Sequence, residues 1–174
     1  MKLAIFGGKK INSKVFRYNT IGKKEISSVV EIMKNGELSG FVASPNGNFF
    51  GGKWVKKLET KFCKFFNVKY AVAVNSATSA LYCMLMSSGI EPGDEVITSP
   101  YTMHATASSI LQCGGVPVFA DIEPNTYGLD PKLVEKKISN KTKAILAVNI
   151  FGHGAELLKL KQIAKKHKLL LLED

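Results

Sequence analysis

Apolar residues recur at the spacing of one helix face twice in the first third of the chain. The two sets are Ile26, Val29, Val30 and Met33, and Val55, Leu58, Phe62 and Phe65. The pattern predicts one helix that ends near Asn35-Gly36 and a second that follows a loop rich in Gly, Ser and Asn at residues 39–52. We therefore assign residues 1–67 to an N-terminal arm that carries two helices and this loop.

From Tyr70 onward, short apolar runs alternate with amphipathic segments. Strands are predicted over Tyr70–Val74, Glu95–Thr98, Pro117–Ala120, Ala144–Asn149 and Leu169–Leu172. Helices are predicted over Ser76–Ser88, His104–Cys113, from Asp130-Pro131 onward, and over Glu156–His167. This alternation is typical of a parallel sheet with helices on both faces. We expect an α/β fold of three layers, α/β/α, with residues 68–174 forming part of one domain.

The last predicted strand, Leu169–Leu172, is continuously apolar, as is typical of a strand buried on both faces. The sequence ends two residues later, at Asp174, before any helix could cover such a strand. We expect the domain to be truncated, so that the chain is a fragment without the rest of its sheet and without a small C-terminal domain.

Charge and composition exclude several classes of protein. The net charge is +10, but the lysines are spread along the chain, arginine is nearly absent and no basic block resembles a nucleic-acid module. Three isolated cysteines without a C-x-x-C pair are typical of a reducing cytosol. No apolar run is long enough for a signal peptide or a membrane span. We expect a cytoplasmic, soluble protein that binds neither nucleic acid nor membrane and holds no metal.

Two polar positions coincide with predicted strand ends, where ligands bind in open parallel sheets. The first is the segment Asn75–Ser79, in which free backbone N–H groups of a helix N-terminus and the hydroxyls of Ser76 and Thr78 could bind a phosphate. The second is Asp174, directly after the last strand. The alternatives are a plain helix cap at Ser76 and an ordinary loop acid at Asp174.

A phosphate site and a carboxylate on one sheet edge together suit pyridoxal 5′-phosphate (PLP). The cofactor's phosphate would lie at the helix N-terminus, and the carboxylate would keep the pyridine nitrogen protonated. A competing motif, Gly47–Lys53, formally fits G-x-x-x-x-G-K. It is followed by Trp54 instead of Ser or Thr and has no strand before it, so we reject a P-loop. A dinucleotide-binding domain is rejected because no G-x-G-x-x-G follows a strand.

A series of short motifs carries a resemblance to a known family. The motifs are Gly51-Gly52-Lys53-Trp54-Val55, Asn75–Leu81, Pro92–Ile97, Gly115–Ile122, Phe151-Gly152 and Glu173-Asp174. In this order and spacing, from about Ile21 onward, the chain resembles the DegT/StrS-type sugar aminotransferases. These are fold-type I PLP-dependent enzymes, and the resemblance implies the large-domain fold of the aspartate aminotransferase type.

The resemblance implies roles for particular residues. Ser76, the backbone of Ala77, and Thr78 would form the phosphate loop, and Asp174 would pair with the pyridine nitrogen. The family usually stacks Phe or Trp on the cofactor ring where this chain has Met103. Met103 could cover the ring here, or Tyr101 or His104 could supply a flat face instead, and we prefer Tyr101.

Two further positions differ from the family pattern or lack an assigned role. Asn149 stands where a His is common, before the Phe-Gly pair. Thr106 lies near the cofactor side of its helix, and we assign it no firm role.

The function that the resemblance implies is transfer of an amino group from glutamate or glutamine to a nucleotide-linked keto-sugar or a keto-cyclitol. Members of the family are homodimers, and the loop at 39–52 resembles an interface element. The family's Schiff-base lysine would lie beyond Asp174, and no lysine here matches its motif, so we expect no catalytic residue in the chain and no activity from it alone. The alternatives are a PLP- or PMP-dependent sugar dehydratase, in which His replaces the lysine, and a non-catalytic partner of a full-length homologue.

Overall fold

The computed structural model describes residues 2–9, 18–41 and 49–174. Its chain forms two compact units, Met1–Ala73 and Val74–Asp174. Half of the predicted loop at 39–52, residues 42–48, lies outside the described residues, and so do the first two residues of the P-loop-like stretch.

The first unit contains both helices that the periodicity predicts. After a short turn η1 (Ala4–Phe6), it forms α1 (Lys23–Asn35) and α2 (Lys53–Phe66). Gly36 ends α1 in the left-handed region with φ 70°, as Gly commonly does after a helix. Neither helix contains a buried residue, and the apolar positions that the spacing marks are exposed except for Val55, which is half-buried.

The prediction of a strand over Tyr70–Val74 is wrong, because this segment forms no strand. Tyr70 and Val72 are 75% and 81% exposed, and the backbone N–H of Ala73 donates to Oε1 of Glu59 (2.9 Å) instead of to a neighbouring strand. An apolar run becomes a buried strand only when a sheet offers it a free edge. Among the described residues, neither edge of the sheet takes it up.

The second unit is built on a four-stranded sheet in which every neighbouring pair is parallel. Its strands are β1 (Glu95–Thr98), β2 (Val116–Phe119), β3 (Thr142–Ala147) and β4 (Leu170–Glu173), in the order β2-β1-β3-β4. The predicted parallel α/β fold is therefore confirmed.

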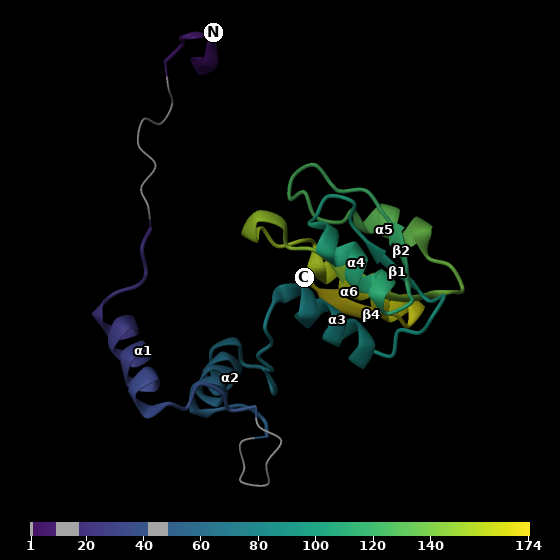
Figure 1. Cartoon of the computed structure of the whole chain (residues 1–174). Coiled ribbons are helices and arrows are strands. Elements are labelled where there is room, and N and C mark those ends of the chain that lie inside the picture. Colours follow the sequence, from purple (N-terminus) through teal and green to yellow (C-terminus); the bar gives the residue numbers. More distant parts are fainter. Residues whose placement is uncertain (1, 10–17, 42–48) are drawn as a thin grey trace. The chain divides into compact units, whose positions relative to one another are not determined.

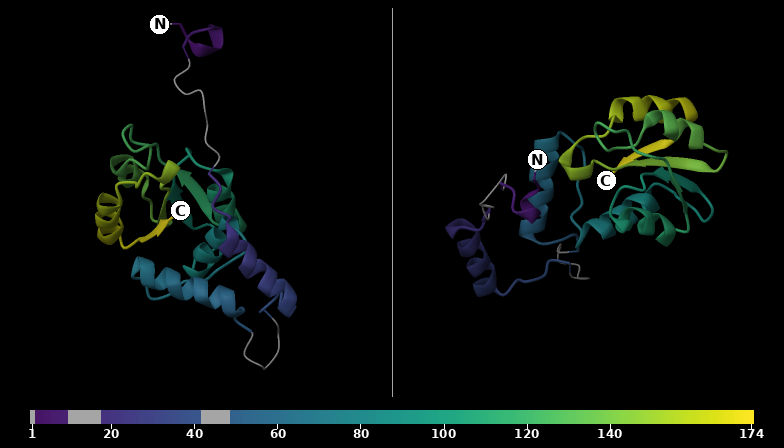
Figure 2. Two further views of the ribbon diagram at one scale, coloured as in Figure 1. Left: turned by 90° about the vertical axis from the view of Figure 1, so that its left-hand side faces the viewer. Right: turned by 90° about the horizontal axis from the view of Figure 1, so that it is seen from above.

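Helices cover both faces of this sheet (Figures 1 and 2). The covering helices are α3 (Ala77–Ser87) and α4 (His104–Gln112) on one face, and α5 (Pro131–Lys137) and α6 (Leu157–His167) on the other. A short turn, η2 (Ile150–Gly152), follows β3. Alternation along β3 divides its residues between the two faces: Ala144 and Leu146 pack with α3 and α4, whereas Ile145 and Ala147 pack with α5 and α6.

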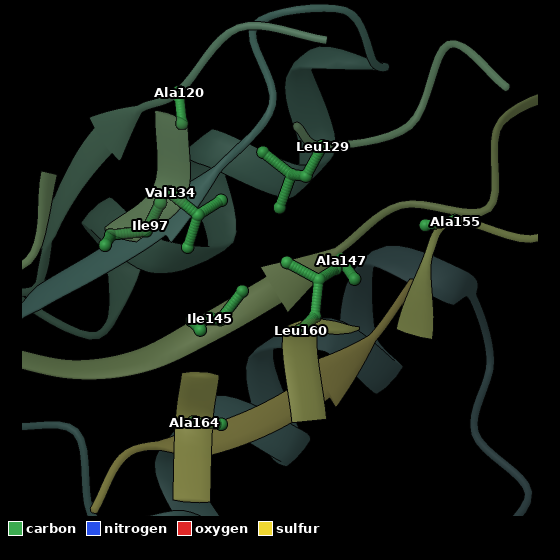
Figure 3. Close-up of a cluster of buried hydrophobic side chains, with 9 residues drawn as sticks. All are labelled: Ile97, Ala120, Leu129, Val134, Ile145, Ala147, Ala155, Leu160 and Ala164. Atoms are coloured by element: carbon green, nitrogen blue, oxygen red, sulfur yellow. The ribbon is translucent and has the colours of Figure 1, made fainter. Parts of the chain in front are cut away.

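The larger core lies between the sheet and the helices α5 and α6. Figure 3 shows its nine buried side chains: Ile97, Ala120, Leu129, Val134, Ile145, Ala147, Ala155, Leu160 and Ala164. Ile97 and Ile145 come from adjacent central strands and are completely buried. This packing fixes the central strands, and with them the ends of those strands.

The predicted strand Leu169–Leu172 is observed as β4, shifted by one residue. It is an edge strand whose leucines are exposed or half-buried, with Leu170 at 44% exposure, so the burial on both faces that its composition indicates is not reached within this chain. Only β3 pairs with it in the described chain. In the same described residues, no helix combines the length and the apolar composition that a membrane crossing requires.

Candidate functional site

The carboxyl ends of the four strands meet at one edge of the sheet, because all four strands are parallel. Asp174 directly follows β4 there. Its backbone N–H donates to the carbonyl of Ala147 (2.8 Å), and its carbonyl accepts from the N–H of Asn149 (2.9 Å). The β3–β4 ladder therefore continues through Asp174 and fixes its main chain.

The carboxylate of Asp174 is held on one side only. Oδ2 accepts a hydrogen bond of 2.6 Å from Oγ1 of Thr106, a residue of α4 that is 1% exposed. Oγ1 of Thr106 also lies 2.9 Å from Oγ1 of Thr102. Within the described ranges, Oδ1 has no hydrogen-bond partner, and the residue is exposed. One carboxylate oxygen is thus available to a ligand at the end of the sheet.

The first turn of α3 lies beside the end of β4 in the views of Figures 1 and 2. Ser76 caps this helix: its hydroxyl accepts from the N–H of Ser79 (3.1 Å) and donates to Oγ of Ser79 (3.0 Å). The N–H groups of Ala77 and Thr78 find no acceptor in the part of the chain that the structure describes, and both residues are exposed. A helix start with free N–H groups is suited to bind an anion.

Tyr101 belongs to a cluster of three aromatic rings next to this edge. Its ring centroid lies 6.1 Å from that of Phe151 and 6.2 Å from that of Tyr127, and its N–H donates to Oγ of Ser99 (3.0 Å). Met103 precedes α4 and is 68% exposed. Tyr101 and Met103 therefore both lie between β1 and α4, and the ring of Tyr101 has two aromatic neighbours.

Asn149 connects the loop after β3 to the end of β4. Its Oδ1 accepts from the N–H of Ala155 (3.0 Å), and its Nδ2 donates to Oε2 of Glu173 (3.3 Å). With the backbone bond to Asp174, it makes three connections. The side chain of Asn149 thus has a structural role beside Asp174.

Sequence reasoning left three features of this region unassigned. It gave Thr106 no firm role, named Phe151 only within a motif and did not single out Tyr127. Thr102 lies before α4, so helix periodicity offered no signal for its contact with Thr106. The contact of Thr106 with Asp174 spans 68 residues of sequence and depends on the order of the strands.

The arrangement fits PLP. A carboxylate oxygen is available for the pyridine nitrogen, free N–H groups at a helix start are available for the phosphate, and an aromatic ring lies near the same edge. This set of groups is typical of the PLP-dependent enzymes with a parallel α/β large domain.

The chain belongs to the DegT/DnrJ/EryC1/StrS aminotransferase family, whose sequence profile matches residues 21–174. It is 42% identical over 154 residues to the spore coat polysaccharide biosynthesis protein SpsC of Bacillus subtilis, covering 88% of this chain and 37% of that protein. It is 34% identical over 174 residues to a putative L-glutamine:3-amino-2,3-dideoxy-scyllo-inosose aminotransferase of Streptoalloteichus tenebrarius, covering 99% and 40%. The chain thus spans less than half the length of these relatives.

Solved structures agree with this assignment. NtdA of Bacillus subtilis, solved with its bound cofactor PMP, has a TM-score of 0.75 and 31% identity, covering 88% of this chain and 34% of its own. A GDP-4-keto-6-deoxy-D-mannose-3-dehydratase of E. coli, solved with hydrated PLP, has a TM-score of 0.78 and 27% identity, covering 90% and 39%. The family is PLP-dependent, and the expected cofactor and large-domain fold are confirmed.

Proposed function

We propose that the protein to which this chain belongs is an aminotransferase that moves an amino group from glutamate or glutamine to a keto-sugar or keto-cyclitol. The observation that carries the proposal is Asp174, whose carboxylate has one bound and one available oxygen beside the first turn of α3. This chain would contribute both polar ends of the cofactor site.

Each end of the site has its own residues. The carboxylate of Asp174 would accept a hydrogen bond from the protonated pyridine nitrogen and hold that proton in place. The N–H groups of Ala77 and Thr78, with the hydroxyl of Thr78, would bind the phosphate, while Ser76 keeps the helix start in shape. When bound, PLP supplies the electron sink of the reaction.

The ring of the cofactor needs a cover between these ends. Tyr101 would provide a flat face, supported by Phe151 and Tyr127. Met103 is the alternative, since its sulfur can contact an aromatic ring.

The choice of substrate rests on the relatives' names. One relative is named for polysaccharide biosynthesis and another for a glutamine-dependent reaction on an inosose, which is a keto-cyclitol. A sugar dehydratase is the second candidate, because the E. coli dehydratase shares the fold. We further propose that the protein is a cytoplasmic homodimer and that none of this chain's lysines is the catalytic amine.

Equilibrium binding of pyridoxamine 5′-phosphate to the full chain, followed by fluorescence, tests the cofactor site. We expect Asp174→Asn to weaken binding about tenfold or more, since charge-assisted hydrogen bonds are the strong ones. Asp121→Asn is the matched control: this exposed carboxylate follows β2, and within residues 2–9, 18–41 and 49–174 its Oδ1 accepts only from the N–H of Ile122. Equal binding by the Asp174→Asn variant and the unmodified chain would refute the proposed site.

A further inference from the structure

The hydroxyls of Thr102 and Thr106 form a hydrogen-bond chain with a single direction. A carboxylate only accepts hydrogen bonds, so the hydroxyl proton of Thr106 points to Oδ2 of Asp174. Oγ1 of Thr106 has then used its only proton and must act as the acceptor toward Thr102. Thr102 is therefore the donor in the 2.9 Å contact, and both hydroxyls are oriented toward the carboxylate.

Thr106 is a fixed point from which Asp174 can be oriented. It is 1% exposed, and its N–H donates to the carbonyl of Met103 (3.1 Å) at the start of α4. Ile110, one turn further along the same helix, is completely buried in the core. Asp174 by contrast is exposed, and its side chain would rotate freely without a partner.

We propose that Thr106, supported by Thr102, is a positioning residue that selects which oxygen of Asp174 meets the cofactor. With Oδ2 occupied by the threonine hydroxyl, Oδ1 is the oxygen presented to the pyridine nitrogen. This inference rests on the proposed function and deepens it: hydroxyls that touch no cofactor determine the geometry of the carboxylate that does.

Two cofactor analogues separate positioning from a general structural effect. The probes are pyridoxamine 5′-phosphate and its 1-deaza analogue, in which a C–H group replaces the ring nitrogen, and the measured quantity is the ratio of their dissociation constants for the full chain. The unmodified chain is expected to prefer pyridoxamine 5′-phosphate about tenfold. Thr106→Val keeps the shape but loses the hydroxyl, and should lose most of that preference by weakening pyridoxamine 5′-phosphate alone. Thr106→Ser should retain the preference.

Ser109→Ala is the matched control, because it removes a buried hydroxyl of α4 whose one partner among the described residues is the carbonyl of Ala105 (2.7 Å). An unchanged preference in Thr106→Val, or an equal weakening of both probes, overturns the positioning role and leaves the proposed function standing. If Thr106→Val does not fold, Thr102→Val takes its place. We expect this variant to lose two- to threefold of the preference for pyridoxamine 5′-phosphate (about half a kcal/mol). An unchanged ratio of the two dissociation constants would contradict the positioning role. Equal binding of both probes by the unmodified chain overturns the inference together with the role of Asp174.

Discussion

Glu123 organises the loop that carries Tyr127 toward the candidate site. Its carboxylate accepts from the N–H groups of Asn125 (3.0 Å) and Thr126 and from the hydroxyl of Thr126. Its backbone N–H donates to the carbonyl of Gly128 (3.0 Å), and its carbonyl accepts from the N–H of Tyr127 (3.1 Å). Tyr127 takes φ 58° as a result, a conformation that non-glycine residues adopt only when their surroundings hold them there.

The pKa of Glu123 makes this loop sensitive to acid. The hydroxyl of Thr126 first, and then the amide of Asn125, lower the pKa of Glu123 to about 2 from an ordinary 4.5. A group with a lowered pKa in the folded state stabilises the fold above its unfolded pKa, and this stabilisation is lost as the pH falls from 4.5 toward 2. We expect Glu123→Gln to reduce the free energy of unfolding at pH 7, with a difference from the unmodified chain that vanishes near pH 2.

Urea denaturation between pH 2 and pH 7 measures that difference. Glu91→Gln is the control, since the side chain of Glu91 is exposed and makes no hydrogen bond or ion pair in the described structure. A difference for Glu123→Gln that stays constant across the pH range would show that the carboxylate charge does not stabilise the loop.

Two leucines of α6 that are two positions apart differ in burial. Leu160 is completely buried against the sheet, whereas Leu158 on the same helix is 80% exposed. We expect Leu160→Ala to lower the free energy of unfolding by about 2–5 kcal/mol, because it leaves a cavity in the core. Leu158→Ala should change it by less than about 0.5 kcal/mol. Chemical denaturation of both variants tests this, and similar losses would contradict the described packing of α6.

The local pattern of apolar and polar residues predicted a helix or strand correctly wherever the segment is buried as its composition indicates. The strand Glu95–Thr98 was predicted with its observed bounds, and Asp130 caps α5 through the N–H of Lys132 (2.8 Å), as its position before a proline suggests. The strand predicted at Tyr70–Val74 does not form, and the strand predicted at Leu169–Leu172 forms but is only half-buried, because apolar composition records what a segment can bury and not which neighbours it finds. Burial on both faces of a strand depends on the sheet, which no local window contains.

The same limit applies to the candidate site. Ser76, Ala77, Thr78 and Asp174 could be proposed from the sequence because each directly adjoins a predicted strand or helix end. The contact between Thr106 and Asp174 could not, since it requires the chain to return beside β3 as β4 and so bring the end of that strand to α4. The 2.6 Å hydrogen bond between Thr106 and Asp174 therefore depends on the strand order, which a local sequence pattern does not contain.

At the scale of the whole chain, burial is concentrated in one of the two units. Both buried hydrophobic clusters lie within Val74–Asp174, and they include residues of both central strands, β1 and β3. In the unit Met1–Ala73, α1 and α2 contain no buried residue. Since buried apolar contacts are what make local opening unfavourable, the two units should differ in local stability.

Native-state hydrogen exchange of the full chain measures this difference at individual amides. We expect amides of β1 and β3 to exchange only through global unfolding, because both strands are covered by helices and flanked by other strands. Amides of α1 should exchange at least about a hundredfold faster, as helices without tertiary packing are marginal in water. The helix α4, also of the second unit, serves as the internal comparison and should follow β1. Equal protection of α1 and β3 would mean that the apolar face of α1, with Ile26 and Met33, is covered in solution, and the division of stability between the units would have to be abandoned.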